Sequence, residues 1–322
     1  MDITPEIAKR LDLLNDKYQA MGQDMKSYLE GLQYMDYLKY WDYVHTDTLL
    51  SLQNPRTNFP DEKIFIIYHQ ITELFFKLCI HEYEQIAEKK DITVDFLIQK
   101  VKRIVHYFDG LNTTYGIMID GMEKDQFLKF RMALLPASGF QSAQYRMIEL
   151  YSTDMVNLVQ KDYAAKNPDV KNLSIKEMFQ HIYWKTGATE LATGRKTLTL
   201  IQFEEKYSGQ FLDLSEKCIT GNLYAKYRTL AGAGVQNLEP LQNLMRDLDS
   251  NINVNWCLQH YRSAVRYLQG DPDIIAATGG TNWQKFLPPR FQRIIFYPEL
   301  WTDQQKADWG KAWVEHVVEK KP

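Results

Sequence analysis

The sequence contains few of the residues that stabilise small secreted domains or that punctuate β-rich folds. It holds three cysteines among 322 residues, at Cys79, Cys218 and Cys257, and none forms a CxxC or zinc-type pair. Disulfide scaffolds, c-type haem attachment and zinc ribbons are therefore unsupported, and we expect buried thiols in a reducing compartment. No alternating strand pair with a tight turn stands out, which argues against a sheet.

The chain also lacks a strong charge of one sign and a long apolar run. Its net charge is -3 and its pI is near 6.2, without a basic cluster, which argues against nucleic acid or an anionic membrane as a partner. The N-terminus has no signal-peptide core, and no later apolar run approaches the roughly 20 residues that a bilayer requires. The sequence therefore predicts a soluble, cytoplasmic protein with neither a nucleic-acid nor a membrane partner.

Amphipathic helical patterns dominate what is present. They extend over 22–42, 61–89, 93–118, 123–134, 141–160, 174–217 with breaks, 237–250 and 253–269. Thr4 followed by Pro5 predicts a further helix start near the N-terminus. The Pro- and Gly-rich breaks are too short for an interdomain linker, and no internal repeat occurs. We therefore expect an all-α fold, a large helical bundle with a single domain over 1–322.

Four polar features within these helices and breaks are candidates for function. Phe65 and His69 lie four residues apart on one helix face, whereas His81 points about 120° away and cannot share a metal ion with His69. His260 follows Trp256 by four residues, Arg131 lies in a segment poor in charge, and "TGGT" at 278–281 is a glycine turn. Taken singly, each is more often structural: most histidines on apolar helices are hydrogen-bonded core residues.

Taken together and in order, these segments resemble a known family. The specific parts are "HQITELFFK", starting at residue 69, and "SGFQSAQYR", starting at residue 138, joined by "YVHTDTLLSLQNPR", "FLKFRMALLPA", Trp256 with His260, and "TGGTNWQKFL". They are similar to the tryptophan 2,3-dioxygenases, haem enzymes that open the indole ring of L-tryptophan. The resemblance covers about 36–301 and is thin between 160 and 250.

The resemblance implies a cofactor and its ligand. His260 would be the proximal ligand of haem b, which is Fe2+ in the active form, with Trp256 beside it. Haem iron held by one neutral imidazole keeps the other axial position open for O2. Ser138 and Gly139 would lie near the distal face of the haem. Phe65 would pack on the indole, and His69 would act as the catalytic residue by accepting a hydrogen bond from the indole N–H, which requires a neutral ring.

The resemblance also implies the substrate contacts and the assembly. Arg131 would clamp the substrate carboxylate, with Phe127 beside it, and Thr278 would hold the ammonium group. Tyr40 and Tyr43 match positions that reach into a neighbouring subunit's pocket, so segment 1–45 would contact a neighbouring subunit of a homotetramer. The implied reaction converts L-tryptophan and O2 to N-formyl-L-kynurenine, a step of tryptophan catabolism in the kynurenine pathway.

Three departures from the family pattern leave alternatives open. Cys257 and Gln259 stand where the family usually has arginines, and Tyr115 with Gly116 replaces a glutamine–tryptophan pair, which predicts the loss of an aromatic wall near the haem. The loop over 269–283 also differs. One alternative is therefore a related haem oxygenase acting on a modified tryptophan, another indole or an aromatic amino acid. Another is a haem-binding sensor without turnover.

Overall fold

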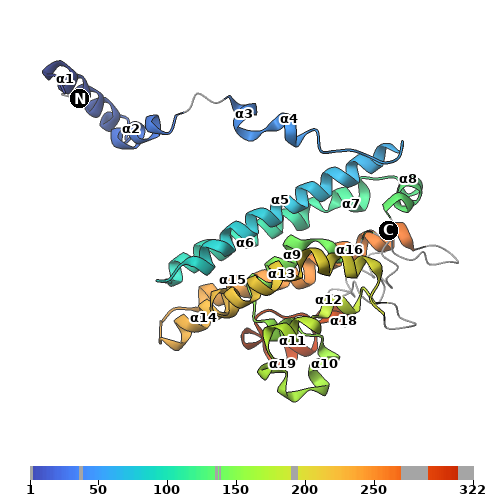
Figure 1. Ribbon diagram of the computed structural model, residues 1–322. Helices are drawn as coiled ribbons and strands as arrows, with labels where there is room; N and C mark the ends of the chain where they lie inside the picture. Colours follow the sequence, from blue (N-terminus) through green and yellow to red (C-terminus); the bar gives the residue numbers. More distant parts are fainter. Residues whose placement is uncertain are drawn as a thin grey trace. The chain divides into compact units, whose positions relative to one another are not determined.

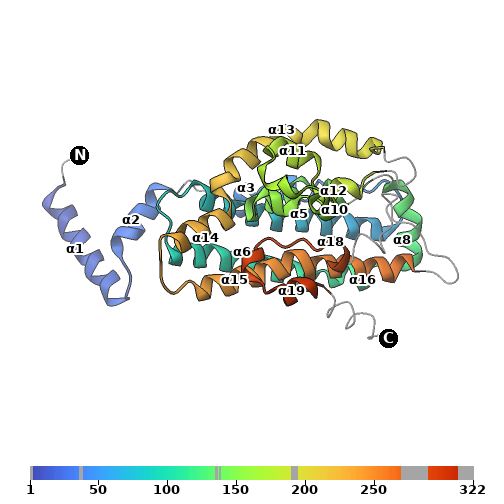
Figure 2. The same ribbon diagram turned by 90° about the horizontal axis from the view of Figure 1, so that it is seen from below.

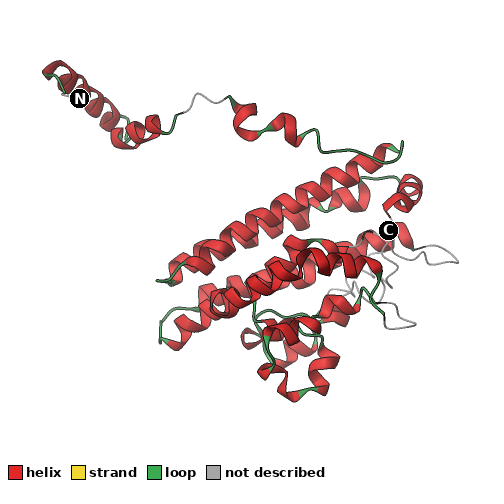
Figure 3. Ribbon diagram, viewed as in Figure 1, coloured by secondary structure: helices red, strands yellow, loops and turns green. Residues whose placement is uncertain are grey.

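The structure, a computed structural model, describes residues 3–35, 39–134, 137, 139–189, 195–269 and 289–310, without the side chains of Arg290 and Phe291. Among these residues the regular elements are all helices, joined by loops, with isolated β-bridges only between Val159 and Ile182 and between Thr189 and Lys196 (Figures 1 and 3). The prediction of an all-α fold is confirmed. Backbone contacts divide the chain into two compact units, Met1–Asn54 and Pro55–Pro322.

The first unit consists of short helices that bury none of their side chains. They are α1 (Pro5–Ala20), α2 (Met25–Gln33), α3 (Tyr40–Val44) and α4 (Thr46–Leu49). The expected start of α1 is observed, because the Thr4 hydroxyl accepts a hydrogen bond from the Ile7 N–H at 3.4 Å. Apolar residues along this unit, such as Leu13 and Trp41, remain exposed.

The second unit is built around two long helices, α5 (Pro60–Glu88) and α6 (Val94–Thr114), which pack side by side (Figures 1 and 2). The others are α7 (Gly116–Asp120), α8 (Lys124–Phe130), η1 (Arg131–Leu134), η2 (Gly139–Gln141), α9 (Ala143–Ser152), η3 (Met155–Leu158), α10 (Lys161–Lys166), η4 (Pro168–Asn172), α11 (Ile175–Gln180), α12 (Tyr183–Thr186), α13 (Leu198–Gly221), α14 (Leu223–Gly232), α15 (Glu239–Ser250), η5 (Asn251–Asn255), α16 (Trp256–Leu268), α18 (Pro289–Gln292), η6 (Pro298–Leu300) and α19 (Asp303–Ala307). Helix α5 contacts α6, α9 and α13, and α6 contacts α15. The core of the second unit includes Ile86, Leu97 and Phe108, each fully buried.

Helix α5 begins where the break at 53–60 predicts, with Pro60 in its first turn. Glu62, almost fully buried, holds the preceding loop by accepting hydrogen bonds from the backbone N–H groups of Arg56 at 2.8 Å and Thr57 at 2.7 Å. These bonds lower the pKa of Glu62 although burial opposes them. By length and hydropathy α5 could also cross a membrane, so the expectation that no such segment exists is wrong for this helix. Here, however, it packs against α6, α9 and α13 and buries three acidic side chains, as a core helix does.

Helix α14 is the main element that the sequence patterns do not predict. The Asn222 side chain caps it by accepting a hydrogen bond from the Ala225 N–H at 2.7 Å, directly after α13 ends at Gly221. The predicted helix over 141–160 is interrupted, because Thr153 leaves α9 in an extended conformation. Its hydroxyl donates to the carbonyl of Phe296, far along the chain. A tertiary contact thus accompanies the end of α9, whereas α14 begins at a local cap.

Candidate functional site

A cavity of about 250 Å³ opens between α5, α9, α12 and α16 in the second unit. We call it the histidine cavity, because His69 of α5 and His260 of α16 both line it. The Gln144 side-chain amide of α9 donates to the Glu73 carbonyl of α5 at 2.8 Å. The Tyr145 hydroxyl of α9 donates to the Ile252 carbonyl of η5 at 3.3 Å. These two bonds tie α9 to α5 and to η5, and so hold the walls of the cavity in place.

His260 presents one ring nitrogen to a backbone carbonyl. Its Nδ1 lies 2.9 Å from the carbonyl oxygen of Trp256. A carbonyl only accepts, so Nδ1 donates its proton and, in the neutral ring, Nε2 keeps its lone pair. Burial lowers the pKa of His260 to about 4, despite the opposing hydrogen bond to Trp256, so the ring is neutral at pH 7. His260 is therefore ready to act as an imidazole ligand.

The helix geometry just before His260 sets which residues face the cavity. η5, a turn of π-helix, joins α15 to α16 without a break. A π-turn inserts one extra residue and rotates the following helix face, and such turns are frequent at functional sites. After it, Trp256, Cys257 and His260 line the cavity together.

His69 is held in the same way from the opposite helix. Its Nδ1 lies 2.7 Å from the carbonyl oxygen of Phe65, so Nε2 is again the acceptor atom of the neutral ring. Desolvation by the surrounding protein lowers the pKa of His69, although part of the ring is exposed. Proximity to His69 also contributes to the lowered pKa of His260. Two neutral imidazoles thus line one cavity, each with its Nδ1 bonded to its own helix.

These features fit a haem. Among the described residues, no group of three or more His, Cys, Asp or Glu side chains gathers into a metal site. A haem brings four ligand nitrogens of its own and requires only one or two from the protein. His260 offers such a nitrogen, and Phe76, Phe140 and Trp256 supply apolar wall to a flat ring system.

A cluster of aromatic rings adjoins the histidine cavity on the side of α8. The ring centroid of Phe65 lies 4.0 Å from that of His69, 6.4 Å from Phe127 and 5.7 Å from Phe130. Phe127 also packs on Tyr267 at 4.5 Å. Phe65 and His69 share one face, as their spacing predicts, and the structure also brings Phe127 to them, on a surface suited to an indole ring.

Of the other predicted site residues, some line the histidine cavity and some do not. Arg131 is buried at the start of η1, four residues after Phe127, and is not among the residues that line the histidine cavity. Gly139 lines that cavity. Tyr40 and Tyr43 belong to the first unit, where they are 72% and 74% exposed.

Two further predicted residues, Ser138 and Thr278, lie outside the described residues, as does the loop over 270–288. The structure therefore bears on neither of them.

Tyr115 packs against His260. Its ring centroid lies 4.8 Å from His260 and 5.2 Å from Trp256, and its side chain is buried. The loss of an aromatic wall near a haem, which the sequence predicts from Tyr115 and Gly116, stays a prediction. Cys257 differs from the expectation of a buried thiol, because it is half-buried and lines the cavity, whereas Cys79 and Cys218 are buried as expected.

Sequence reasoning missed a buried polar cluster in the same wall. Arg146 forms an ion pair with Glu149 at 3.2 Å and donates to the Tyr183 hydroxyl at 3.2 Å, and Tyr183 in turn donates to Glu149. Arg146 and Tyr183 line the cavity. The available signal was an arginine with a glutamate three residues later inside the apolar run of α9, since two charges there need each other.

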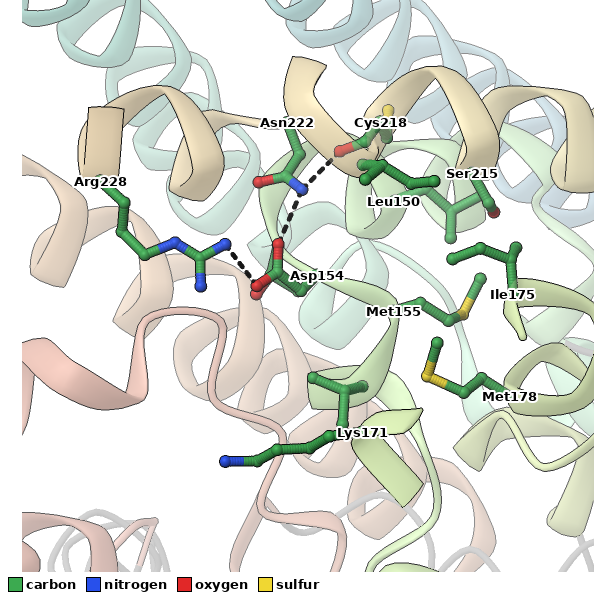
Figure 4. A pocket seen from close by; sticks show the side chains of 13 residues that line it. Leu150, Asp154, Met155, Lys171, Ile175, Met178, Ser215, Cys218, Asn222 and Arg228 are labelled. Carbon is green, nitrogen blue, oxygen red and sulfur yellow. Dashed lines mark hydrogen bonds and ion pairs between the residues drawn. The ribbon is translucent and has the colours of Figure 1, made fainter. Parts of the chain in front are cut away.

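A second cavity, of about 270 Å³, lies beside the junction of α9 and η3. There the side chains of Arg228 and Asn222 converge on Asp154, at 2.6 Å and 3.0 Å (Figure 4). Asn222 also caps α14. The carboxylate oxygens are thus satisfied by structural partners, so this cluster serves to join α14 to η3.

Comparisons with known proteins show what the chain is similar to. The sequence model of the tryptophan 2,3-dioxygenase family matches residues 31–180, which include α5, α8 and α9. The tryptophan 2,3-dioxygenase of Ruegeria pomeroyi is 26% identical over 275 residues, covering 84% of this chain and 93% of the relative. The chain is thus similar to tryptophan 2,3-dioxygenases over most of its length, at modest identity.

Two further relatives differ in identity and coverage. The tryptophan 2,3-dioxygenase of Bacillus thuringiensis is 25% identical over 279 residues, covering 84% of this chain and 92% of the relative. That of Ruegeria sp. strain TM1040 is 37% identical over 138 residues, which cover 42% of this chain and 47% of the relative. These similarities support an oxygen-using oxidoreductase.

Proposed function

We propose that the protein is a haem-dependent dioxygenase that converts L-tryptophan and O2 to N-formyl-L-kynurenine. Both oxygen atoms enter the product, one at each carbon of the cleaved indole C2–C3 bond. The observation that carries the proposal is the pair of neutral imidazoles, His69 and His260, facing one cavity with each Nδ1 bonded to a backbone carbonyl.

In this proposal each histidine has its own role. His260 holds haem b through Nε2, and Trp256 and Tyr115 fix the plane of its imidazole. When bound, ferrous haem supplies the redox chemistry for O2. His69 accepts the indole N–H through its Nε2, because its Nδ1 is already bonded to the Phe65 carbonyl. Protonation of His69 would remove this acceptor, so its lowered pKa favours the reactive form.

The substrate's remaining groups have proposed partners near the aromatic cluster. Phe65 and Phe127 cover the indole faces. Arg131 binds the carboxylate through its guanidinium, and Thr278 receives the ammonium group. Burial of Arg131 strengthens such a charge-assisted bond, because water competes less for the guanidinium.

We further propose a cytoplasmic homotetramer in which segment 1–45 contacts a neighbouring subunit. Support comes from the first unit, whose helices bury no side chain and expose apolar residues such as Leu32, Tyr40 and Trp41. Exposed apolar patches of this kind mark interaction surfaces. Light scattering of the full chain tests this, since a monomer would contradict it, and Tyr40→Ser with Tyr43→Ser should weaken assembly.

Spectroscopy and product analysis test the activity. The protein is purified with haem supplied, its visible spectrum is recorded in ferric, ferrous and carbon-monoxide forms, and L-tryptophan is added under air. N-formyl-L-kynurenine is the expected product. Turnover of another indole or aromatic amino acid instead would mean that this molecule is the substrate. Haem binding without any turnover would favour a haem-binding sensor.

Two variants assign the histidines. His260→Ala should lose haem binding, and retention of haem with an unchanged axial-nitrogen spectrum would refute the ligand assignment. His69→Ala should keep haem and lower kcat/KM about 100-fold, because the indole loses an orienting contact. His81→Ala is the matched control, since His81 is exposed on the same helix outside the cavity, and it should leave both properties unchanged.

A further inference from the structure

Arg146 has more hydrogen-bonding capacity than its structural partners use. It lies one turn into α9, is 7% exposed, and lines the histidine cavity. Its Nη1 atom makes the contacts to Glu149 and to the Tyr183 hydroxyl, at 3.2 Å each. Its Nε is buried and has no hydrogen-bond partner among the described residues. A guanidinium carries five N–H donors, so an acceptor is missing from this site.

The surroundings fix the guanidinium and keep it charged. Its central carbon lies 4.7 Å from the ring centroid of Tyr145 and 5.8 Å from those of Tyr183 and Trp184. Burial is the largest single effect on the pKa of Arg146 and would lower it, but the Glu149 carboxylate together with Tyr183 and Tyr145 outweighs burial and raises the pKa above its ordinary value. A rigid, permanent cation with a buried unsatisfied donor therefore forms part of the cavity wall.

An ion pair with a purely structural role would leave none of its buried polar atoms without a partner. In the second cavity, Asp154 is matched by Arg228 and Asn222, and none of these three has a buried polar atom lacking a partner. Around Arg146 the pairing to Glu149 is incomplete, and an unsatisfied buried N–H is costly. The geometry is the one in which a guanidinium recognises a planar anion with its free donors.

We propose that Arg146 binds a carboxylate of a molecule that occupies the histidine cavity. The inference rests on the proposed function, which supplies two sources of such carboxylates, the propionate side chains of haem and the carboxylate of the amino-acid substrate. Both are planar anions that match the guanidinium fork. Arg146 is thus a binding residue of the cavity in addition to the histidines and to Arg131.

Porphyrins with and without free carboxylates test the first source. Zinc protoporphyrin IX and its dimethyl ester are titrated by fluorescence into the full-length, ligand-free chain. Wild type should prefer the diacid by roughly tenfold to a hundredfold, as expected for charge-assisted hydrogen bonds to a buried cation. The double variant Arg146→Met, Glu149→Gln removes both buried charges together, which avoids leaving Glu149 unpaired. It should bind diacid and ester about equally.

The controls separate the guanidinium from its neighbours. Glu149→Gln alone keeps Arg146 and should keep the preference for the diacid. Arg228→Met removes an arginine paired with a carboxylate outside the histidine cavity and should also keep it. Circular dichroism of each variant establishes that it is folded before titration.

Substrate analogues test the second source on the haem-loaded protein. Binding of L-tryptophan is compared with binding of L-tryptophanamide, which lacks the carboxylate. If the double variant loses this selectivity and keeps the preference for the diacid porphyrin, the bound carboxylate is that of the substrate. If both preferences are the same in the double variant as in wild type, the role assigned to Arg146 is wrong. Failure of wild type to bind either porphyrin would instead refute haem binding itself, and with it this inference.

Discussion

The lowered pKa of His260 predicts how the stability of the ligand-free protein changes with pH. Burial lowers this pKa from 6.5 to about 4. Between these values the unfolded chain binds a proton at His260 and the folded chain does not, so the free energy of unfolding falls as the pH drops through this window. The whole gap corresponds to about 3 kcal/mol, and about 2 kcal/mol is expected because the ring is half-buried.

Comparison with His260→Phe isolates this contribution. Urea unfolding of both ligand-free proteins is measured between about pH 7 and pH 4.5, and wild type should lose about 2 kcal/mol relative to the variant over that range. Other titrating groups are common to both proteins and cancel. The same comparison with the exposed His81→Phe should show no such divergence. Parallel curves for wild type and His260→Phe, or an NMR titration midpoint of His260 at or above 6.5, would refute the reasoning.

Three further substitutions have effects that follow from buried contacts. Asp249→Asn should lower the free energy of unfolding by about 3 kcal/mol in urea denaturation. The buried Asp249 carboxylate accepts the Trp301 side-chain N–H at 3.0 Å and also backbone N–H groups. An amide in its place offers one acceptor oxygen fewer. Lys100→Met should cost about 2 kcal/mol in the same measurement, since the buried Glu82 loses its partner at 2.8 Å and keeps only the more exposed Arg103 at 3.2 Å. Arg131→Met should keep haem and raise the KM for L-tryptophan at least about tenfold in steady-state kinetics, because a carboxylate loses its charge-assisted bonds.

Each of these expectations has a result that contradicts it. Unchanged unfolding midpoints in Asp249→Asn or Lys100→Met would mean that these buried carboxylates do not depend on the contacts described. For Arg131, the exposed Lys129 provides the control, since Lys129→Met removes a neighbouring cation outside the aromatic cluster. An equal KM in wild type and Arg131→Met would remove Arg131 from the substrate site.

Periodicity alone predicts much of the helical framework. The long helices α5 and α6 begin and end close to the residues predicted, because Pro60 and Thr93 are start signals written in the local sequence. α14 and the end of α9 were not predictable in this way. The end of α9 depends on a contact far along the chain, between Thr153 and Phe296, whereas α14 starts at a local Asn222 cap that hydrophobic periodicity does not reveal.

The sequence by itself determined the all-α class, the shared face of Phe65 and His69, and the spacing of Trp256 and His260, since helical geometry fixes which side chains share a face. Only the tertiary structure brought His69 and His260, almost two hundred residues apart, to one cavity and bonded each Nδ1 to its own helix. The tertiary structure alone also placed Tyr115 against His260 and Arg146 in the cavity wall. Packing between helices decides such meetings, because burial, pKa and unsatisfied donors are properties of the surroundings that distant segments create.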